Sequence, residues 1–271
     1  MTCRVRVAAV AGSSGTVLEE LSGTEPWRPR ILGRDGRSAR DGWAARDGRA
    51  ARDGRAASVA LVQSRASILR GDDVELSVDV GEGAALELVE IGATLTHDGR
   101  GGAPAQISVE ITVGDGGRLT WIGTALIVAR GAEVRRTVHV ELCGRGQALL
   151  GETIVLGRAQ GLCGALSART RIVCDGRPTV DETLETGDAA TLHSPVVASR
   201  ATVIAGLTLA GVRDDEPPPG AMQAHGTATL WRATGTATDV ARWAAPVADR
   251  WRGVLARRRS EEGQVAVQLP R

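Results

Sequence analysis

The most constraining feature of this sequence is an alternation of apolar and polar residues with a period of two, which recurs after residue 58. Four clear examples are Val74–Val80, Ile107–Val113, Val138–Leu142 and Val203–Leu209. Successive side chains of a strand point to opposite faces, so this period is typical of strands with one buried face. The sequence therefore predicts a mainly β fold that is built from many half-buried strands.

Short glycine turns separate the predicted strands at regular intervals. Gly81-Glu-Gly83, Gly114-Asp-Gly116 and Gly144-Arg-Gly146 each precede another apolar stretch, at spacings of 33 and then 30 residues. Glycine readily adopts the positive φ that tight hairpin turns require. The repeat predicts stacked antiparallel strands that share a continuous core, although the hairpins of an ordinary sandwich would produce the same pattern.

Composition limits both the core and the function. The chain of 271 residues contains no Phe and no Tyr, and six Trp are its only aromatic residues. The core must therefore consist mainly of Val, Leu, Ile and Ala, which suit a pleated sheet. The formal net charge is +1, which gives no sign of the clustered positive charge that nucleic-acid binding needs. We expect no nucleic-acid partner.

Residues 34–57 differ from the rest of the chain. The unit Ala-Arg-Asp-Gly recurs at positions 39, 45 and 51. Each Asp-Gly favours a turn, and too few apolar residues are present to offset the entropy of ordering the segment. We expect a single domain over residues 1–271, with 34–57 as a flexible insert. The alternative is an Arg/Asp arm that grips a partner.

A helical period replaces the strand period near the C-terminus. The apolar residues at this spacing are Val240, Trp243, Val247, Trp251, Val254 and Leu255, with Thr238 or Asp239 as N-cap. Pro246 interrupts the pattern and can begin a second helix, so we expect one or two C-terminal helices. A face that bears two Trp suits either core packing or docking.

Cysteine usage and apolar runs bear on the compartment. Four sparse cysteines argue against a disulfide framework and are compatible with a reducing cytosol. The apolar stretch Val7–Ala11 is too short for the core of a signal peptide, and Ala201–Val212 is too short to span a membrane. We expect a cytoplasmic protein without a membrane partner.

Few groups of residues point to catalysis or to tight metal binding. The sequence has no Gly-x-Ser-x-Gly elbow, no Walker loop and no His-Glu-x-x-His. His139 and Glu141 share one face of a predicted strand and could belong to a weak, open ion path, or simply to an exposed polar face. We expect no enzyme activity, no confident metal site and no tightly bound cofactor.

A family resemblance is carried by a series of short segments in order. These segments are Arg70-Gly-Asp-Asp-Val-Glu-Leu, Gly83-Ala-Ala-Leu-Glu-Leu, Gly117-Arg-Leu-Thr-Trp121, Gly131–Leu142, Gly151-Glu-Thr-Ile-Val-Leu-Gly-Arg158 and the ending Pro270-Arg271. Together they resemble the urease accessory protein UreD (UreH) family over about two-thirds of the chain. The sequence departs from the family pattern at Gly151, where the family has an aromatic residue.

The resemblance implies a UreD-like, mainly β fold and a role as a urease maturation scaffold. Such a scaffold links the nickel-carrying GTPase UreG and the accessory protein UreF to apo-urease, and a polar tunnel is proposed to pass nickel, which would bind transiently. The alternatives are a non-catalytic β-solenoid or β-sandwich binding module and an unrecognised hydrolase. Exposed aromatic residues would favour the binding module, and polar residues gathered at one end of the strands would favour the hydrolase.

Glu152 is the strongest candidate for a polar interior. It belongs to the matched segment and lies on an otherwise apolar predicted strand. Because a buried carboxylate needs a partner or a water path, we expect Glu152 and Arg158 to contribute to such an interior. The alternative is a purely structural ion pair.

Overall fold

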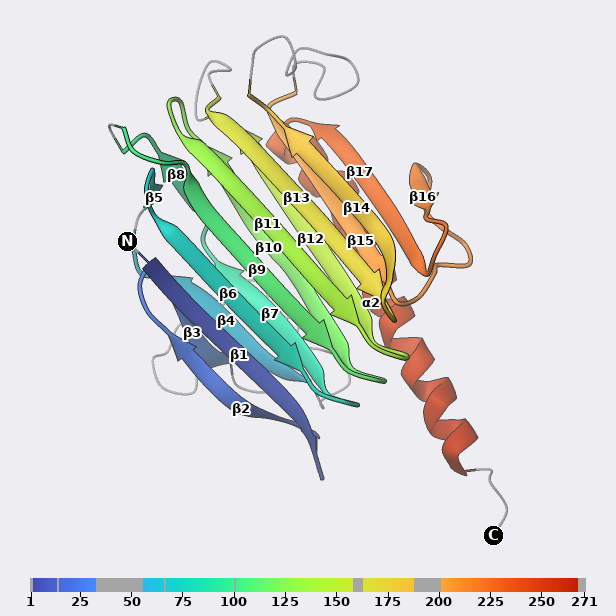
Figure 1. Ribbon diagram of the computed structural model, residues 1–271. Helices are drawn as coiled ribbons and strands as arrows, with labels where there is room; N and C mark the ends of the chain where they lie inside the picture. The colour runs from blue at the N-terminus through green and yellow to red at the C-terminus, as the bar shows by residue number, and fades with distance from the viewer. Residues whose placement is uncertain are drawn as a thin grey trace.

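In the described part of the computed structural model, two β-sheets lie face to face and the helix α2 (Ala237–Val267) lies outside them (Figure 1). The structure describes residues 2–13, 15–32, 56–65, 67–99, 101–157, 163–187 and 201–267, with side chains described up to Ala256. The predicted mainly β fold is confirmed. The segment 34–57 lies outside the described residues, except for Ala56 and for Ala57, which begins a strand.

The first sheet, called sheet A here, has seven strands. In spatial order these are β14 (Arg177–Glu185), β13 (Ala165–Cys174), β11 (Glu133–Leu142), β9 (Ala105–Val113), β6 (Asp73–Val80), β1 (Thr2–Gly12) and β2 (Gly15–Gly23).

The second sheet, sheet B, has ten strands. Eight follow one another as β16 (Ala221–Gln223), β17 (Ala228–Gly235), β15 (Val203–Ala210), β12 (Gln147–Leu156), β10 (Arg118–Val128), β7 (Ala85–Ile91), β4 (Ala57–Gln63) and β3 (Trp27–Leu32). The remaining two, β5 (Ile68–Leu69) and β8 (Thr94–His97), pair beside β10.

The direction of pairing differs from the prediction of antiparallel strands. Neighbours in the centre of both sheets, such as β6–β9, β9–β11 and β10–β12, are parallel. The physical reason is that the chain alternates between the sheets, so that two parallel neighbours in one sheet are separated along the chain by one or two strands of the other. Antiparallel pairs flank this centre at β1–β2, β13–β14, β3–β4 and from β12 through β15 to β17.

The glycine turns carry the chain from sheet A to sheet B instead of closing hairpins. Gly83, Gly116 and Gly144 have φ of 63°, 61° and 56°, which favours glycine. Successive turns also stack closely, because a Cβ on Gly114 would lie only 2.9 Å from the backbone nitrogen of Glu82. The sequence repeat thus corresponds to one turn of a flattened coil, as expected for stacked units.

An ion pair joins two of these stacked turns. Arg145 donates to Asp115 Oδ1 at 3.1 Å and to Oδ2 at 2.8 Å. Its guanidinium, together with the Arg145 backbone N–H, lowers the pKa of Asp115 to about 2. The turns are therefore tied side chain to side chain as well as through their backbones.

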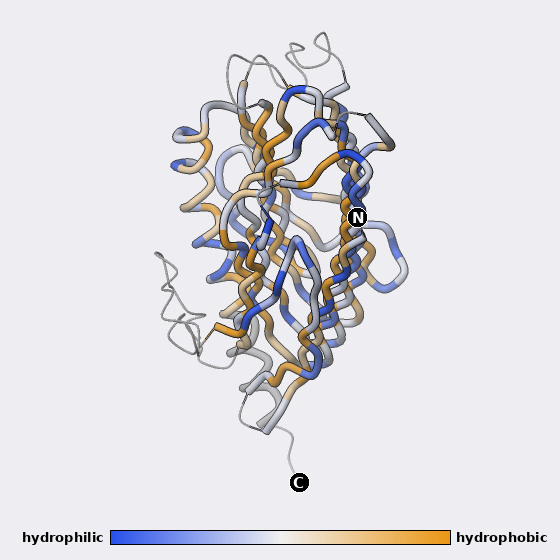
Figure 2. Tube along the Cα trace, turned by 90° about the vertical axis from the view of Figure 1, so that its left-hand side faces the viewer, coloured by the Kyte–Doolittle hydropathy of each residue, from blue (hydrophilic) through white to orange (hydrophobic). Residues whose placement is uncertain are grey.

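The core lies between the sheets, as the two layers seen edge-on in Figure 2 show. Val74, Val78, Val109, Val140 and Leu119 are among its fully buried members. Aliphatic side chains at alternate strand positions fill this space, so the lack of Phe and Tyr is no obstacle to packing.

One helix, α2 (Ala237–Val267), covers the outer side of sheet B against β12, β15 and β17. Thr236 caps it by accepting the backbone N–H of Asp239 at 3.2 Å, so the helix begins slightly before the predicted cap. Pro246 lies inside this single helix. The two Trp differ, since Trp251 is fully buried and Trp243 is 42% exposed.

Candidate functional site

An ion pair crosses the core between the two sheets. Arg136 of β11 points inward with Val134 and Val138, and Glu152 of β12 points inward with Ile154. Arg136 Nη1 donates to Glu152 Oε1. The two side chains are only 14% and 30% exposed. Glu152 and Arg136 thus form a partly buried ion pair between the two sheets.

A second carboxylate lies beside this pair, at an irregularity of sheet B. The register of β10 against β12 shifts between Ile122 and Ala125. Glu90 of β7 accepts the Trp121 Nε1–H at 3.0 Å, the Thr124 backbone N–H at 3.0 Å and the Thr124 hydroxyl at 2.9 Å. The Glu90 side chain therefore supplies an acceptor to the interrupted strand, as bulges commonly require.

A small cavity of about 30 Å³ connects these groups. Its polar lining consists of Glu90, Thr94, Thr124, Arg136, Glu152 and Thr153. A polar cavity of this size can hold a water-sized species.

A second ion pair links the sheets closer to their β14–β17 side. Arg232 of β17 bonds to Glu182 of β14, and the side chains are 28% and 45% exposed. Arg232 is in register with Gly206, which is in register with Glu152. We call this group the polar seam; its members are Glu90, Arg136, Glu152, Arg232 and Glu182. Of the four side chains in these two ion pairs, Arg136 is the least exposed and Glu182 the most exposed, so the pairs are most open at the β14 edge.

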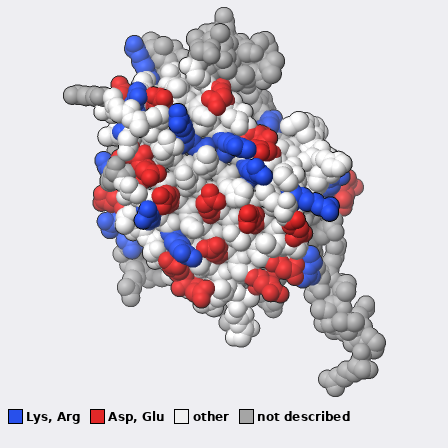
Figure 3. All heavy atoms as spheres, in the orientation of Figure 1, with Lys and Arg blue, Asp and Glu red and all other residues white. Residues whose placement is uncertain are grey.

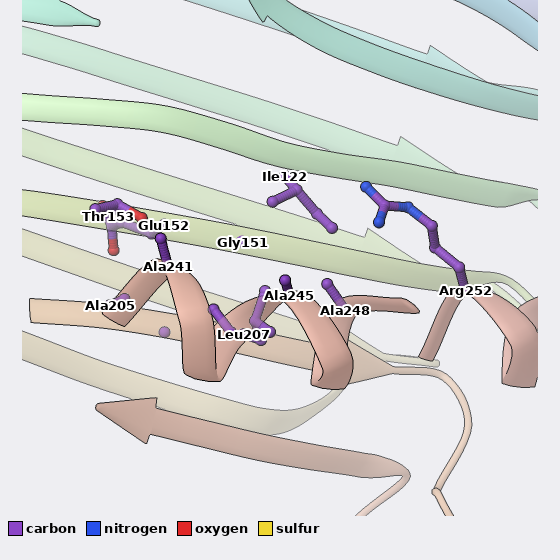
Figure 4. Close-up of a pocket in the computed structure, with 12 residues that line it drawn as sticks. Ile122, Gly151, Glu152, Thr153, Ala205, Leu207, Ala241, Ala245, Ala248 and Arg252 are labelled. Carbon is purple, nitrogen blue, oxygen red and sulfur yellow. The ribbon is translucent and has the colours of Figure 1, made fainter. Parts of the chain in front are cut away.

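A groove of about 220 Å³ lies on the opposite face of sheet B, beneath α2 (Figure 4). Alanines of the helix face Ile122, Gly151 and Leu207 across it, and Arg252 stands at one end. The groove and the inter-sheet cavity share Gly151, Glu152 and Thr153. This part of β12 therefore borders a polar space on one face and a mainly apolar space on the other.

A buried carboxylate fastens the helix over this groove. Asp214 accepts hydrogen bonds from Arg250 at 2.5 and 2.7 Å and from Trp251 Nε1 at 3.0 Å. The Arg250 guanidinium lowers the pKa of Asp214 below its ordinary value. The Asp214 side chain thus positions α2.

Two other predicted site residues, His139 and Glu141, are not part of the polar seam. His139 Nε2 lies 3.3 Å from Glu141 Oε1 on the outer face of β11, opposite to the inward face that carries Arg136. Figure 3 shows this face of sheet A with acidic and basic side chains interspersed. Arg158 lies outside the described residues. Among the residues described, no three His, Cys, Asp or Glu gather closely enough to hold a metal ion.

Sequence reasoning missed Arg136, Glu90, Arg232 and Glu182. Each lies on the face of its strand that otherwise carries apolar side chains. Glu90 follows Leu86 and Leu88, and Arg136 lies between Val134 and Val138. Glu182 lies between Val180 and Leu184, and Arg232 follows Ala228 and Leu230. The sequence did carry a signal for these residues, which is a charged residue at a strand position where the residues two before and two after it are apolar.

Comparisons with known proteins give consistent matches. The family model described as UreD urease accessory protein matches residues 37–269. The chain is 39% identical over 160 residues to "Urease accessory protein UreD 1" of Streptomyces griseus, covering 59% of this chain and 62% of that protein. It is 34% identical to "Urease accessory protein UreD 1" of Saccharopolyspora erythraea, covering 60% and 64%.

A third relative extends the match. "Urease accessory protein UreD" of Streptomyces coelicolor is 32% identical over 179 residues, covering 66% of this chain and 63% of that protein. The matched part of the chain thus spans less than two-thirds of the length of each of these relatives. Within the residues that the structure describes, no helix combines the length and the apolar character that crossing a bilayer requires.

Proposed function

Because the chain belongs to the UreD urease accessory protein family, we propose that it acts in urease maturation as a non-catalytic scaffold in the cytoplasm. In this role it links UreF and the nickel-carrying GTPase UreG to apo-urease and assists the insertion of nickel. Nickel is a transient cargo in this proposal and no cofactor is held tightly.

The observation that supports an ion-handling role is the polar seam. Its three carboxylates and two guanidiniums lie between sheets that are otherwise packed with aliphatic side chains. Charges inside a core cost desolvation energy. Replacing a buried ion pair by apolar side chains of similar volume often leaves the stability of a protein unchanged or raises it. A group of charges between the two sheets therefore suits a function better than it suits packing.

The ligand chemistry of the described residues fits passage better than storage. Tight sites for transition metals commonly use several imidazole or thiolate ligands in a fixed geometry. The inter-sheet cavity instead offers two carboxylates and three threonines. Weak oxygen ligands release an ion readily, as delivery to another protein demands.

The proposal is tested by co-expressing the chain with a UreF-like protein, UreG and apo-urease. We expect a complex that co-purifies with urease and raises the nickel content of urease above that obtained without this chain. Glu152→Gln should leave the pull-down unchanged and lower the nickel content several-fold.

The matched control is Arg169→Met. Arg169 pairs with Asp181 at 2.9 and 2.8 Å on the exposed face of sheet A, so both readouts should stay at the wild-type level. A chain that retains neither UreF nor urease, and leaves the nickel content unchanged, would refute the scaffold role.

A further inference from the structure

A run of three prolines lies in the loop between β15 and β16. The loop contains the segment Asp214-Asp-Glu-Pro-Pro-Pro-Gly220, and β16 follows directly. Figure 1 shows this loop and β16 at the edge of sheet B, where they project from the body of the molecule. Glu216, Pro217 and Pro219 are all exposed. The proline run therefore belongs to the surface and not to the core.

The prolines fix the conformation of this segment. A proline restricts its own φ to about −65°, and it pushes the residue before it toward an extended or polyproline II conformation. The three residues Glu216–Pro218 each precede a proline, so all three are restricted in this way. The Pro218 carbonyl then accepts the Ala221 backbone N–H at 3.0 Å, which closes a turn. Its central residues are Pro219 and Gly220, and the φ of 79° at Gly220 suits a type II turn.

Hydrogen bonds to the core anchor both ends of the segment. At its start, the Asp214 carboxylate is bound by Arg250 and Trp251. Asp214 Oδ1 also accepts the Glu216 backbone N–H at 3.2 Å. At its end, Gln223 Nε2 of β16 donates to the Asp214 carbonyl at 2.7 Å. A segment that is stiff and held at both ends loses little conformational entropy when it binds a partner.

The segment presents apolar side chains next to an acidic one. Pro217 and Pro219 are exposed, and Met222, just beyond the turn, is 53% exposed. The Glu216 side chain is 89% exposed. Arg250 Nη2 lies 4.0 Å from Glu216 Oε2 but already donates to Asp214 at 2.7 Å. Exposed proline and methionine side chains add little to the stability of the fold, whereas both are common in docking surfaces.

We propose that Glu216–Pro219 is a docking segment for a partner protein in the urease maturation complex. The partner surface that fits it is a shallow groove lined by aromatic side chains, because a preformed polyproline II stretch packs well on such a groove. An arginine or lysine at one end of the groove pairs with Glu216. The placement of this partner in the maturation complex rests on the proposed function.

The test is the dissociation constant of the purified full-length chain for a UreF-like protein and for apo-urease, each measured separately by surface plasmon resonance. Glu216→Arg reverses the exposed charge and leaves the anchoring backbone N–H in place. We expect it to raise one of the two dissociation constants at least about tenfold, since repulsion replaces an ion pair. Pro217→Ala should raise the same constant roughly threefold, because the segment is less rigid before it binds.

The matched control is Glu82→Arg. Glu82 is an exposed carboxylate in the glycine turn before β7, so its reversal changes the net charge by the same amount. Both dissociation constants should stay at the wild-type level. An equal loss in Glu82→Arg would overturn the proposal, because the effect would then come from net charge alone.

Two further results would overturn it. One is wild-type affinity for both proteins in Glu216→Arg, and the other is a loss in Glu216→Arg that Pro217→Ala does not share, since the prolines would then not be recognised. Should Pro217→Ala lower the Tm, Glu216→Arg carries the test at low and high salt. Its deficit should shrink at high salt, and a deficit that does not depend on salt would rule out the ion pair.

The outcome is separable from that of the scaffold role. A wild-type chain that binds neither the UreF-like protein nor apo-urease would refute both the scaffold role and the docking segment. Wild-type binding that Glu216→Arg and Pro217→Ala retain in full would keep the scaffold role and remove the docking segment alone.

Discussion

Single charged residues at inward-facing strand positions decide where this molecule is polar. Glu152 and Arg136 reach each other only because β11 and β12 lie in opposite sheets. Asp214, in the loop between β15 and β16, is another buried charge; it is 2% exposed and accepts hydrogen bonds from both Arg250 and Trp251. In each case a buried carboxylate is matched by donors, as the cost of burying it requires.

At this scale Asp214 predicts a pH dependence. Its pKa in the folded chain is lowered, mainly by the Arg250 hydrogen bond. A lowered pKa contributes stability that is present above the ordinary pKa of an aspartate and is lost as the pH falls through the folded value. Asp214→Asn should cost about 1–3 kcal/mol at pH 7 and flatten this acid loss. Urea unfolding at pH 7 and below pH ~4 measures both effects; an unchanged slope with pH would contradict the prediction.

Elements are joined here by three kinds of contact. Glycine turns stack and pass the chain between sheets, parallel ladders align successive strands, and α2 covers sheet B through one apolar stripe. The helix buries Val247, Trp251, Val254 and Leu255 against Leu149 and Leu209 of the sheet. Docking of α2 should therefore depend on a few large side chains.

Two tryptophans of the same helix provide a matched comparison. Trp251→Ala removes a fully buried side chain and a hydrogen bond to Asp214, and should cost about 3–5 kcal/mol. Trp243→Ala removes a side chain that is 42% exposed and should cost under about 1 kcal/mol. Chemical denaturation followed by circular dichroism separates them; equal losses would mean that burial does not govern the docking of α2.

The whole molecule is a flattened coil whose ends are closed by antiparallel strands. Its central rungs are the sequence repeat, and its outer rungs are β1–β2 and β13–β14 in sheet A. The end of β3 and the start of β4 lie side by side, since Leu32 pairs with Ser58 in an antiparallel register. The coil itself does not need a long connection there.

Deleting residues 36–56 should therefore leave the free energy of unfolding within about 1 kcal/mol of the wild type, because loop length enters the closure entropy only logarithmically. The remaining Gly33, Arg34 and Asp35 would join Leu32 to Ala57 as a short hairpin loop. Thermal unfolding of the shortened chain measures the change. A loss of several kcal/mol would show that the removed segment contributes to the core.

The sequence by itself determined the alternating strands after residue 58, their buried faces, the positions of the glycine turns and the C-terminal helix, because these depend on local periodicity and on the special conformations of glycine. It also singled out Glu152 as a charge on an apolar strand. It could not determine strand direction, since alternation reads the same in parallel and antiparallel sheets. Only the tertiary structure decided that Arg136, which lies on a strand of the other sheet, is the partner of Glu152. Which side chains meet across the core depends on how the chain passes between the two sheets, and the alternation of residues within one strand does not contain that information.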